Sequence, residues 1–301
     1  MTEYRAYQVQ QAEKLDPCKT DDVYYLALWQ DTTLIGYSMT RQESIEKLNR
    51  AGWTSKQIQH VMKVIEEDCN GDISWAAITQ RLLNHEPIEY ITGYDYFMNL
   101  KLHVSKDVLL PRPETEDLMA LIFQHIPSEN TVKASFLDIG TGSGCIALAL
   151  KQRYSTAQVH AIDVCPKALA IAEKNSQMHD LSLSLRECDI LKPNDWEGGK
   201  LKYIVSNPPY IPPSERHEMA RATLSYEPEL ALFVNEEDPL IFYRHIGLLG
   251  KKALSLKGEL WVECGFKQGG AIADLYRHQG YTTSLYRDGS GVNRFVRAIR
   301  N

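Results

Sequence analysis

The fold class of this chain is indicated by one short segment, Phe136-Leu137-Asp138-Ile139-Gly140-Thr141-Gly142-Ser143-Gly144. Its first residues form an apolar run of the length of a buried strand, and an apolar helix pattern follows at 145–150. The glycines between them allow the backbone to turn and to approach a ligand closely. Their spacing, Gly-x-Gly-x-Gly, differs from the Gly-x-Gly-x-x-Gly of dinucleotide-binding proteins. The stretch therefore predicts a ligand-binding turn at the carboxyl edge of a parallel sheet, with a nucleotide-like ligand favoured.

Strand and helix patterns alternate from residue 134 onward, which is typical of a parallel sheet with helices on both faces. The last two strand patterns are joined by a glycine-containing segment, Asp288–Asn293, and this predicts a hairpin. We expect a Rossmann-like α/β domain with a seven-stranded sheet whose last strand is antiparallel. The predicted strands are Ser135–Ile139, Gln158–Val164, Ser182–Glu187, Lys202–Ser206, Gly258–Cys264, Tyr281–Arg287 and Arg294–Ile299.

The first part of the chain, 1–86, has apolar residues at helical spacing and predicts a small helical domain. Contact with a substrate and a purely stabilising cap are both compatible with this pattern. A linker with β-hairpin character is expected at 87–110, and the α/β domain at 111–301. The predicted helices of the first part are Tyr4–Leu15, Asp21–Ile35, Arg41–Ala51, Ser55–Cys69 and Ser74–Leu83. The β-like runs of the linker are Tyr90–Thr92, Tyr94–Phe97 and Lys101–Val104, and a further helix is expected at Asp117–His125.

The composition is that of a globular protein, with 44% hydrophobic and 24% charged residues among 301. The net charge of −6 provides no general attraction to a phosphate backbone, so we expect no stable nucleic-acid binding. Six cysteines show no Cys-x-x-Cys pair, which disfavours a zinc site or a disulfide framework and favours reduced thiols. We expect no metal. The sequence shows neither a signal peptide nor an apolar run of about 18 residues, so we expect a cytoplasmic protein without a membrane partner.

Two acidic residues follow the next strands of the predicted sheet. Asp163 ends the strand after the glycine turn, at about the 20-residue spacing from Gly140 that is typical of a ribose-binding acid. Asp189 ends the third strand, where a carboxylate can accept from an adenine amino group while Ile190 packs on the ring. A solvated aspartate at a strand end is the alternative for Asp163, and an aspartate in a loop is the alternative for Asp189. Together with the glycine turn, Asp163 favours adenosyl binding.

The run Asn207-Pro208-Pro209-Tyr210 follows the fourth strand and is suited to methylation of a planar nitrogen. Such a nitrogen is a poor nucleophile, because its lone pair is delocalised, and an enzyme must align it with an electrophile. The Asn207 side-chain oxygen and the Pro208 carbonyl can each accept a hydrogen bond from one N–H group of this nitrogen, and Tyr210 can pack against its plane. A rigid turn without chemistry is the alternative. S-adenosylmethionine, bound at the neighbouring glycine turn, carries a suitable methyl group, and the methylated nitrogen loses its proton readily without a strong base.

These motifs resemble those of the release-factor glutamine methyltransferases, and the resemblance covers nearly the whole chain. It includes Arg112-Pro113-Glu114-Thr115-Glu116, Pro87-Ile88-Glu89-Tyr90-Ile91-Thr92-Gly93 and Tyr226-Glu227-Pro228-Glu229-Leu230-Ala231-Leu232. It implies a class I methyltransferase fold and methyl transfer from S-adenosylmethionine to the glutamine of the Gly-Gly-Gln motif of class-I peptide-chain release factors.

The same resemblance implies roles for residues of this chain. Asn207 and Pro208 would be catalytic, and together with Pro209 and Tyr210 they would bind the substrate glutamine, while Arg112 to Glu116 would lie beside the cofactor. We expect a monomer that releases S-adenosylhomocysteine. The residues expected to bind the cofactor are Gly140, Thr141, Gly142, Ser143, Gly144, Asp163, Asp189, Ile190 and Asn207.

Two other functions remain open from the sequence. An amino-methyltransferase acting on adenine in DNA or RNA faces the same geometric problem and uses similar motifs after flipping the base. The acidic charge balance and the lack of an evident basic recognition domain count against it. A cofactor-binding assembly protein without activity is the second alternative, which the intact Asn207 and glycine turn disfavour.

Overall fold

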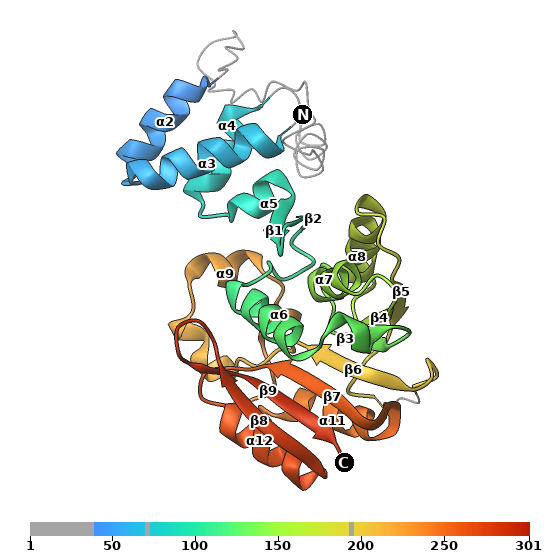
Figure 1. The fold of residues 1–301 in the computed structure, drawn as a ribbon. Coiled ribbons are helices and arrows are strands. Elements are labelled where there is room, and N and C mark those ends of the chain that lie inside the picture. Colours follow the sequence, from blue (N-terminus) through green and yellow to red (C-terminus); the bar gives the residue numbers. More distant parts are fainter. Residues whose placement is uncertain (1–38, 70–72, 193–195) are drawn as a thin grey trace, which may run out of the picture. The chain divides into compact units, whose positions relative to one another are not determined.

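The computed structural model describes residues 39–69, 73–192 and 196–301, and it divides into two compact units at Tyr94 and Asp95 (Figure 1). This boundary falls within the predicted linker, 87–110. Two of the predicted helices, Tyr4–Leu15 and Asp21–Ile35, lie outside the described residues.

The first unit is helical, as its apolar spacing predicts. Thr40 and Thr54 each form a capping box, with Glu43 and Gln57 respectively, and these boxes satisfy the first N–H groups of two helices. The apolar faces pack into one core that includes Leu48, Ile65 and Ile78. The helices are α2 (Arg41–Arg50), α3 (Ser55–Asp68), α4 (Trp75–Leu83) and α5 (Ile88–Thr92).

The linker contains one hairpin, and one of its predicted strands is wrong. Tyr90–Thr92 belongs to the short helix α5, which follows Pro87 and ends at Gly93 in the left-handed conformation. A proline before a helix and a glycine after it are the usual signals of helix ends, and here they outweigh the β-branched residues. Strands β1 (Tyr94–Phe97) and β2 (Leu100–His103) form the expected hairpin.

The second unit is built on a seven-stranded sheet with the order β5-β4-β3-β6-β7-β9-β8 (Figure 1). Strands β3 to β7 pair in parallel, and β9 is antiparallel to both β7 and β8. The Rossmann-like sheet with an antiparallel last strand is thereby confirmed. The strands are β3 (Ser135–Ile139), β4 (Gln158–Asp163), β5 (Ser184–Glu187), β6 (Leu201–Ser206), β7 (Leu254–Glu263), β8 (Tyr281–Arg287) and β9 (Asn293–Arg300).

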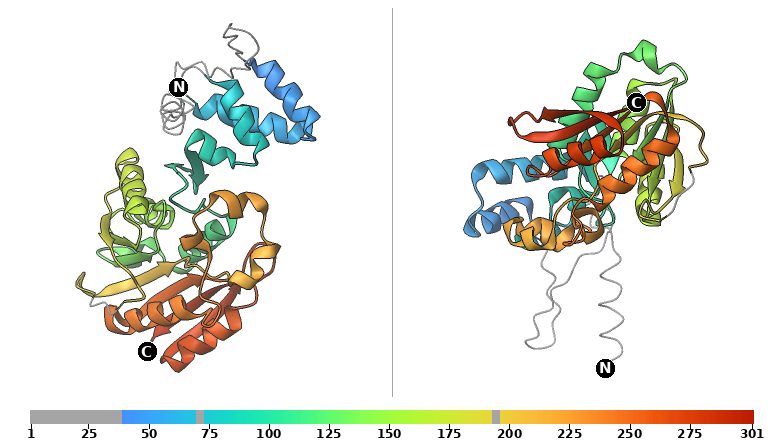
Figure 2. Two further views of the ribbon diagram at one scale, coloured as in Figure 1. Left: turned by 180° about the vertical axis from the view of Figure 1, so that it is seen from behind. Right: turned by 90° about the horizontal axis from the view of Figure 1, so that it is seen from below.

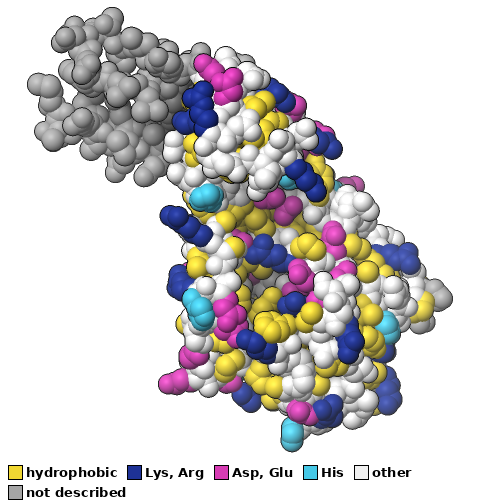
Figure 3. All heavy atoms as spheres, turned by 90° about the vertical axis from the view of Figure 1, so that its left-hand side faces the viewer, with side chains coloured by type: hydrophobic (Ala, Val, Ile, Leu, Met, Phe, Trp, Pro, Cys, Tyr) yellow, Lys and Arg dark blue, Asp and Glu magenta, His cyan; other side chains and the backbone are white. Residues whose placement is uncertain are grey.

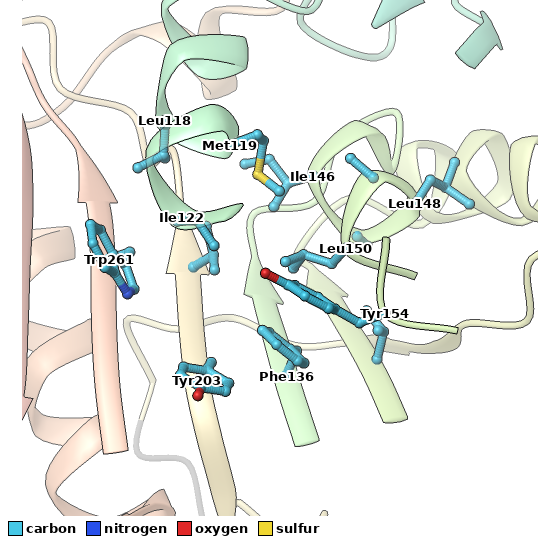
Figure 4. Packing of buried hydrophobic residues seen from close by; sticks show 14 of the residues in the cluster. Leu118, Met119, Ile122, Phe136, Ile146, Leu148, Leu150, Tyr154, Tyr203 and Trp261 are labelled. Carbon is cyan, nitrogen blue, oxygen red and sulfur yellow. The ribbon is translucent and has the colours of Figure 1, made fainter. Parts of the chain in front are cut away.

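Helices cover both faces of this sheet because its central strands are apolar on both sides. Successive residues of β3 point to opposite faces, so Phe136 packs with α6 and α7, whereas Leu137 packs with α11 and α12. Figure 4 shows the first of these cores, and the view from behind brings α11 and α12 in front of the strands (Figure 2). The helices around the sheet are α6 (Pro113–His125), α7 (Cys145–Arg153), α8 (Pro166–Met178), α11 (Ile241–Ala253) and α12 (Gly269–His278).

Helix α6 begins four residues earlier than predicted, at Pro113, a favourable first position because proline lacks only an N–H that would be unpaired there. Beyond β6, the chain forms the short helices α9 (Arg221–Tyr226) and α10 (Glu229–Leu232). Ile211 pairs with Phe233 in an isolated bridge, which ties the loop after β6 to the end of α10.

Among the described residues, Cys145, Cys165, Cys188 and Cys264 are free thiols, as predicted. Cys18 lies outside the described residues. The expectation of a reduced thiol is wrong for Cys69, which is disulfide-bonded. Within the described ranges, no helix combines the length and apolar character that crossing a membrane requires.

Candidate active site

A cavity of about 210 Å³ opens at the carboxyl ends of β3, β4 and β6. The strand order reverses at β3, which has β4 on one side and β6 on the other, and ligands of open α/β sheets bind at such a point. We call this space the first cavity. Its lining includes six residues that the sequence predicts for the cofactor: Gly140, Gly142, Asp163, Asp189, Ile190 and Asn207.

The glycine turn leaves open space where side chains would otherwise project. Gly140 and Gly142 have φ angles of +72° and +54°, and no atom lies within 4 Å of a Cβ built on either residue. The Ile162 carbonyl accepts hydrogen bonds from the N–H groups of Gly140 and Thr141, at 2.9 and 3.0 Å, and so fastens the turn to β4. The backbone itself therefore forms this wall of the first cavity, which allows a ligand to approach closely.

Asp138 lies beneath the turn and was not assigned a role from the sequence. Its Oδ2 atom accepts hydrogen bonds from the Thr141 hydroxyl at 2.6 Å and from the Ala147 N–H at 3.2 Å. The side chain is fully buried, and this loss of solvation raises its pKa to about 7. Asp138 thus joins β3, the glycine turn and α7.

Asp163 is held at the rim of the first cavity by two backbone N–H groups. Gly142 donates to Oδ2 and Cys165 donates to Oδ1, both at 2.9 Å. Burial raises the pKa of the Asp163 carboxyl despite these hydrogen bonds. Each oxygen keeps acceptor capacity for a further donor, as the predicted ribose hydroxyls require.

Asp189 and Ile190 lie on the same side of the first cavity, after β5. The Asp189 side chain accepts from the Leu191 N–H at 3.0 Å and lies 3.4 Å from the Lys192 ammonium group. Ile190 packs against the core on the α11 side of the sheet. An acidic group and an apolar wall at this place fit an adenine ring.

The run Asn207-Pro208-Pro209-Tyr210 separates the first cavity from a second one. Asn207 and Pro208 line both cavities, Pro209 lines the first, and Tyr210 lines the second. The Gln268 side chain donates to the Tyr210 carbonyl at 2.9 Å and holds the end of the run. The second cavity has a volume of about 190 Å³ and also includes Arg112, Met219 and Thr223.

Two residues that contact Asn207, directly or through one neighbour, were missed from the sequence. The Asn207 Nδ2 atom donates to the Thr115 hydroxyl at 3.1 Å, and that hydroxyl donates to Glu263 Oε2 at 2.7 Å. Burial raises the pKa of Glu263 to about 7. One signal for Glu263 exists in the sequence, because an acidic residue ends an apolar strand at the same sheet edge as the glycine turn. Thr115 lies in the segment Arg112 to Glu116 that the resemblance places beside the cofactor, but no role for its hydroxyl follows from the sequence, because both partners of that hydroxyl are distant in the chain.

Arg112 is held by an ion pair at the second cavity. Its guanidinium contacts both carboxylate oxygens of Glu227 at 2.7 Å, and the Glu227 side chain is only 2% exposed. This pair joins the start of α6 to the segment between α9 and α10. Arg112 therefore lines the second cavity, whereas the resemblance places the segment from Arg112 to Glu116 beside the cofactor.

The residues of the first cavity fit S-adenosylmethionine. The two glycines provide a cradle that side chains would fill, and carboxylates lie where hydroxyl and amino groups need acceptors. Three other predicted residues shape the turn without lining the cavity. Thr141 and Ser143 are buried, and Gly144, which directly precedes α7, lies against Ala172 of α8. Among the described residues, no group of three or more His, Cys, Asp or Glu side chains is arranged to hold a metal ion.

The sheet topology and this site define a class I methyltransferase fold. The family model of the methyltransferase small domain matches residues 116–233. An rRNA methyltransferase of T. thermophilus, solved with AdoMet and guanosine, matches with a TM-score of 0.50 at 13% identity. That match covers 69% of this chain and 50% of the solved one, and it supports the fold alone.

Sequence relatives identify the family within this class. The release factor glutamine methyltransferase of Bacteroides thetaiotaomicron is 41% identical over 73% of this chain and 78% of its own length. That of Flavobacterium psychrophilum is 36% identical over 80% of this chain and 86% of its own length. The chain belongs to the release factor glutamine methyltransferase family.

Proposed function

We propose that the chain transfers a methyl group from S-adenosylmethionine to the side-chain amide nitrogen of the glutamine in the Gly-Gly-Gln motif of class-I release factors. One observation carries this proposal: Asn207 lies between the two cavities with its amide nitrogen bonded to Thr115. Its Oδ1 atom is therefore the part of the amide that is left to accept a hydrogen bond from a substrate N–H.

The first cavity would hold the cofactor. Gly140 and Gly142 would contact it through their backbones, Asp163 would accept from the ribose hydroxyls, and Asp189 with Ile190 would bind the adenine. The cofactor supplies a methyl group on a cationic sulfonium. The enzyme then needs mainly to align the acceptor nitrogen with this methyl group, and such alignment lowers the activation free energy by several kcal/mol.

The second cavity would admit the glutamine side chain. Asn207 Oδ1 and the Pro208 carbonyl would each accept one N–H of the glutamine amide, and Tyr210 would pack against its plane. Holding both N–H groups leaves the nitrogen lone pair as the only part of the amide directed at the methyl donor. The methylated nitrogen then loses one proton readily, so no dedicated base is required.

The other parts of the chain have proposed roles as well. We propose the division into a helical substrate-contact domain (1–86), a linker (87–110) and a catalytic domain (111–301), with the protein acting as a monomer. Because its substrates work in translation termination, we also place the reaction in the cytoplasm.

The face of the molecule drawn in Figure 3 is consistent with a protein substrate. On the face shown in Figure 3, Lys and Arg side chains lie among Asp and Glu side chains, and the described part of this face shows no continuous basic stripe. An enzyme acting on adenine in DNA or RNA would need such a stripe to hold the phosphate backbone.

The test uses labelled S-adenosylmethionine and a purified release factor, either wild-type or with the glutamine of its Gly-Gly-Gln motif replaced. We expect label in the wild-type factor only. Equal labelling of both factors would show that the methyl group goes elsewhere, and labelling of DNA or RNA alone would support the adenine alternative. Cofactor binding without transfer to any factor would support the assembly protein.

A further inference from the structure

Glu263 is a buried carboxylate that the reaction described above does not use. It ends β7, is 1% exposed, and is not part of the lining of either cavity. Burying an ionised carboxylate is costly unless hydrogen bonds compensate for the lost water. The Thr115 hydroxyl provides one such bond at 2.7 Å. The position of Glu263 therefore needs an explanation that includes Thr115.

Thr115 connects Glu263 to the proposed catalytic asparagine. It lies in the first turn of α6, is 2% exposed, and its hydroxyl contacts both Glu263 Oε2 and Asn207 Nδ2. A hydroxyl group has one proton to donate and lone pairs to accept with. Above a pH of about 7 Glu263 is ionised and can only accept, so the Thr115 proton is directed at Glu263, in the direction of the 2.7 Å hydrogen bond. Only a lone pair of Thr115 is then left to face Asn207.

This polarity determines which end of the Asn207 amide faces Thr115. A lone pair on Thr115 is compatible with the Nδ2 donor and repels the Oδ1 acceptor. Nδ2 therefore points to Thr115, and Oδ1 is the end that remains for a substrate. With the amide reversed, Asn207 would present its own N–H groups to the N–H groups of the glutamine, and the hydrogen bond would be lost.

We propose that Thr115 and Glu263 are positioning residues that set the orientation of the Asn207 amide for the methyl acceptor. The proposal rests on the proposed function, because it assigns the role of Asn207 Oδ1 to the recognition of a substrate N–H. This role also explains why a carboxylate is buried at the end of β7. A neutral amide can both donate and accept, and an apolar side chain can do neither, so neither would fix the direction of the Thr115 hydroxyl proton.

The test compares Thr115→Val, which removes the hydroxyl at nearly constant volume, with Thr115→Ser, which keeps it. Thr131→Val is the matched control, because the Thr131 hydroxyl is also buried but donates to the Ser128 carbonyl, away from the site. The assay is run near pH 8.5, where Glu263 is ionised, and it measures single-turnover methyl transfer to a release factor at saturating cofactor.

For Thr115→Val we expect a fall in the transfer rate of about tenfold or more, by analogy with the loss of groups that orient a ligand. The dissociation constant of the cofactor should stay within about twofold, since a hydrogen bond outside the cofactor cavity is removed. Thr115→Ser should recover most of the rate, and Thr131→Val should match the wild type. If Thr115→Val does not fold, Glu263→Gln takes its place and should slow transfer with unchanged cofactor affinity.

A second readout needs no substrate. In protein labelled with ¹⁵N at asparagine, the side-chain NH₂ resonances of Asn207 are identified by their loss in Asn207→Asp. Solvent exchange of these protons should be about tenfold faster in Thr115→Val than in the wild type, the effect of losing one hydrogen bond, and unchanged in Thr115→Ser.

Equal exchange rates in the wild type and Thr115→Val would overturn the positioning proposal, whatever the substrate proves to be. So would a wild-type transfer rate in Thr115→Val, or a loss in Thr115→Ser as large as in Thr115→Val. If the wild-type protein fails to methylate any release factor, the proposed function fails, and the exchange experiment alone decides the orientation of Asn207.

Discussion

At the scale of single residues, Asn207 is expected to act in methyl transfer and to contribute little to cofactor affinity. It lines both cavities, yet the glycines and carboxylates of the first cavity supply most of the contacts available to a cofactor. We expect Asn207→Ala to slow transfer by roughly 10² or more, as loss of a preorganised polar group does, with little change in cofactor affinity. Single-turnover kinetics and calorimetry measure the two quantities.

The exposed residue Asn235 provides a matched control, and Asn235→Ala should leave both quantities unchanged. Weaker cofactor binding with normal turnover at saturation would mean that Asn207 has been given the wrong role.

Asp163 should show the opposite pattern. Its carboxylate accepts hydrogen bonds from two backbone N–H groups at the rim of the first cavity, and it is the predicted acceptor for the ribose hydroxyls. Removal of a charged acceptor costs about 1.5–3 kcal/mol, so Asp163→Ala should raise the dissociation constant of the cofactor by at least tenfold. Transfer at saturating cofactor should change much less. A defect confined to the transfer rate would contradict the ribose assignment.

Asp138 predicts a dependence of stability on pH. Burial raises its pKa to about 7 in the folded protein, from an ordinary value near 4, so the folded state holds this proton more tightly than the unfolded chain. Its contribution to stability is therefore complete below about pH 4 and is lost as the pH rises through 7.

The variant Asp138→Asn does not titrate at this position. Its free energy of unfolding, relative to the wild type, should shift in favour of the variant between pH 4 and pH 8. Denaturant unfolding at several pH values measures this difference, and a constant difference would show that the Asp138 pKa is not raised.

At the scale of elements, the turn between β3 and α7 combines two requirements at different glycines. Gly142 has a φ of +54° and open space at its Cβ, whereas a Cβ on Gly144 would lie 3.1 Å from the Ala172 Cβ of α8. Either alanine costs about 1–2 kcal/mol in the left-handed conformation. Gly144→Ala should lower stability further through the clash with α8.

Gly142→Ala should instead weaken cofactor binding beyond its effect on stability, because its side chain would project into the first cavity. Thermal unfolding and cofactor titration of both variants test this division. Wild-type affinity in Gly142→Ala would contradict the assignment of the first cavity to the cofactor.

The elements themselves were largely predictable. The strands β3 and β8 have the predicted bounds, and the other strands of the sheet differ at their ends. Short apolar runs bounded by turn residues mark strands well, whereas strand ends depend on pairing partners that a single sequence does not show. Helix α5 was missed because its β-branched residues favour a strand, although Pro87 and Gly93 mark its ends and packing with α3 and α4 supports the helix.

At the scale of the whole molecule, the first cavity was predictable and the support of Asn207 was not. Parallel strands end at one edge, so the glycine turn, Asp163 and Asn207 could be placed together from strand order alone. Thr115 and Glu263 are 148 residues apart in the chain, and their contact depends on how α6 packs against β7. No local pattern reports such a contact, and the same holds for Arg112 with Glu227.

If this geometry methylates the amide nitrogen of one glutamine, the added methyl group must be found on that side chain in the reaction product. A class-I release factor is incubated with the protein and S-adenosylmethionine, and the peptide with the Gly-Gly-Gln motif is sequenced by tandem mass spectrometry. We predict one added methyl group, located on the side chain of the motif glutamine and absent in the reaction with Asn207→Ala. A methyl group on another residue, or two on the same nitrogen, would contradict the account.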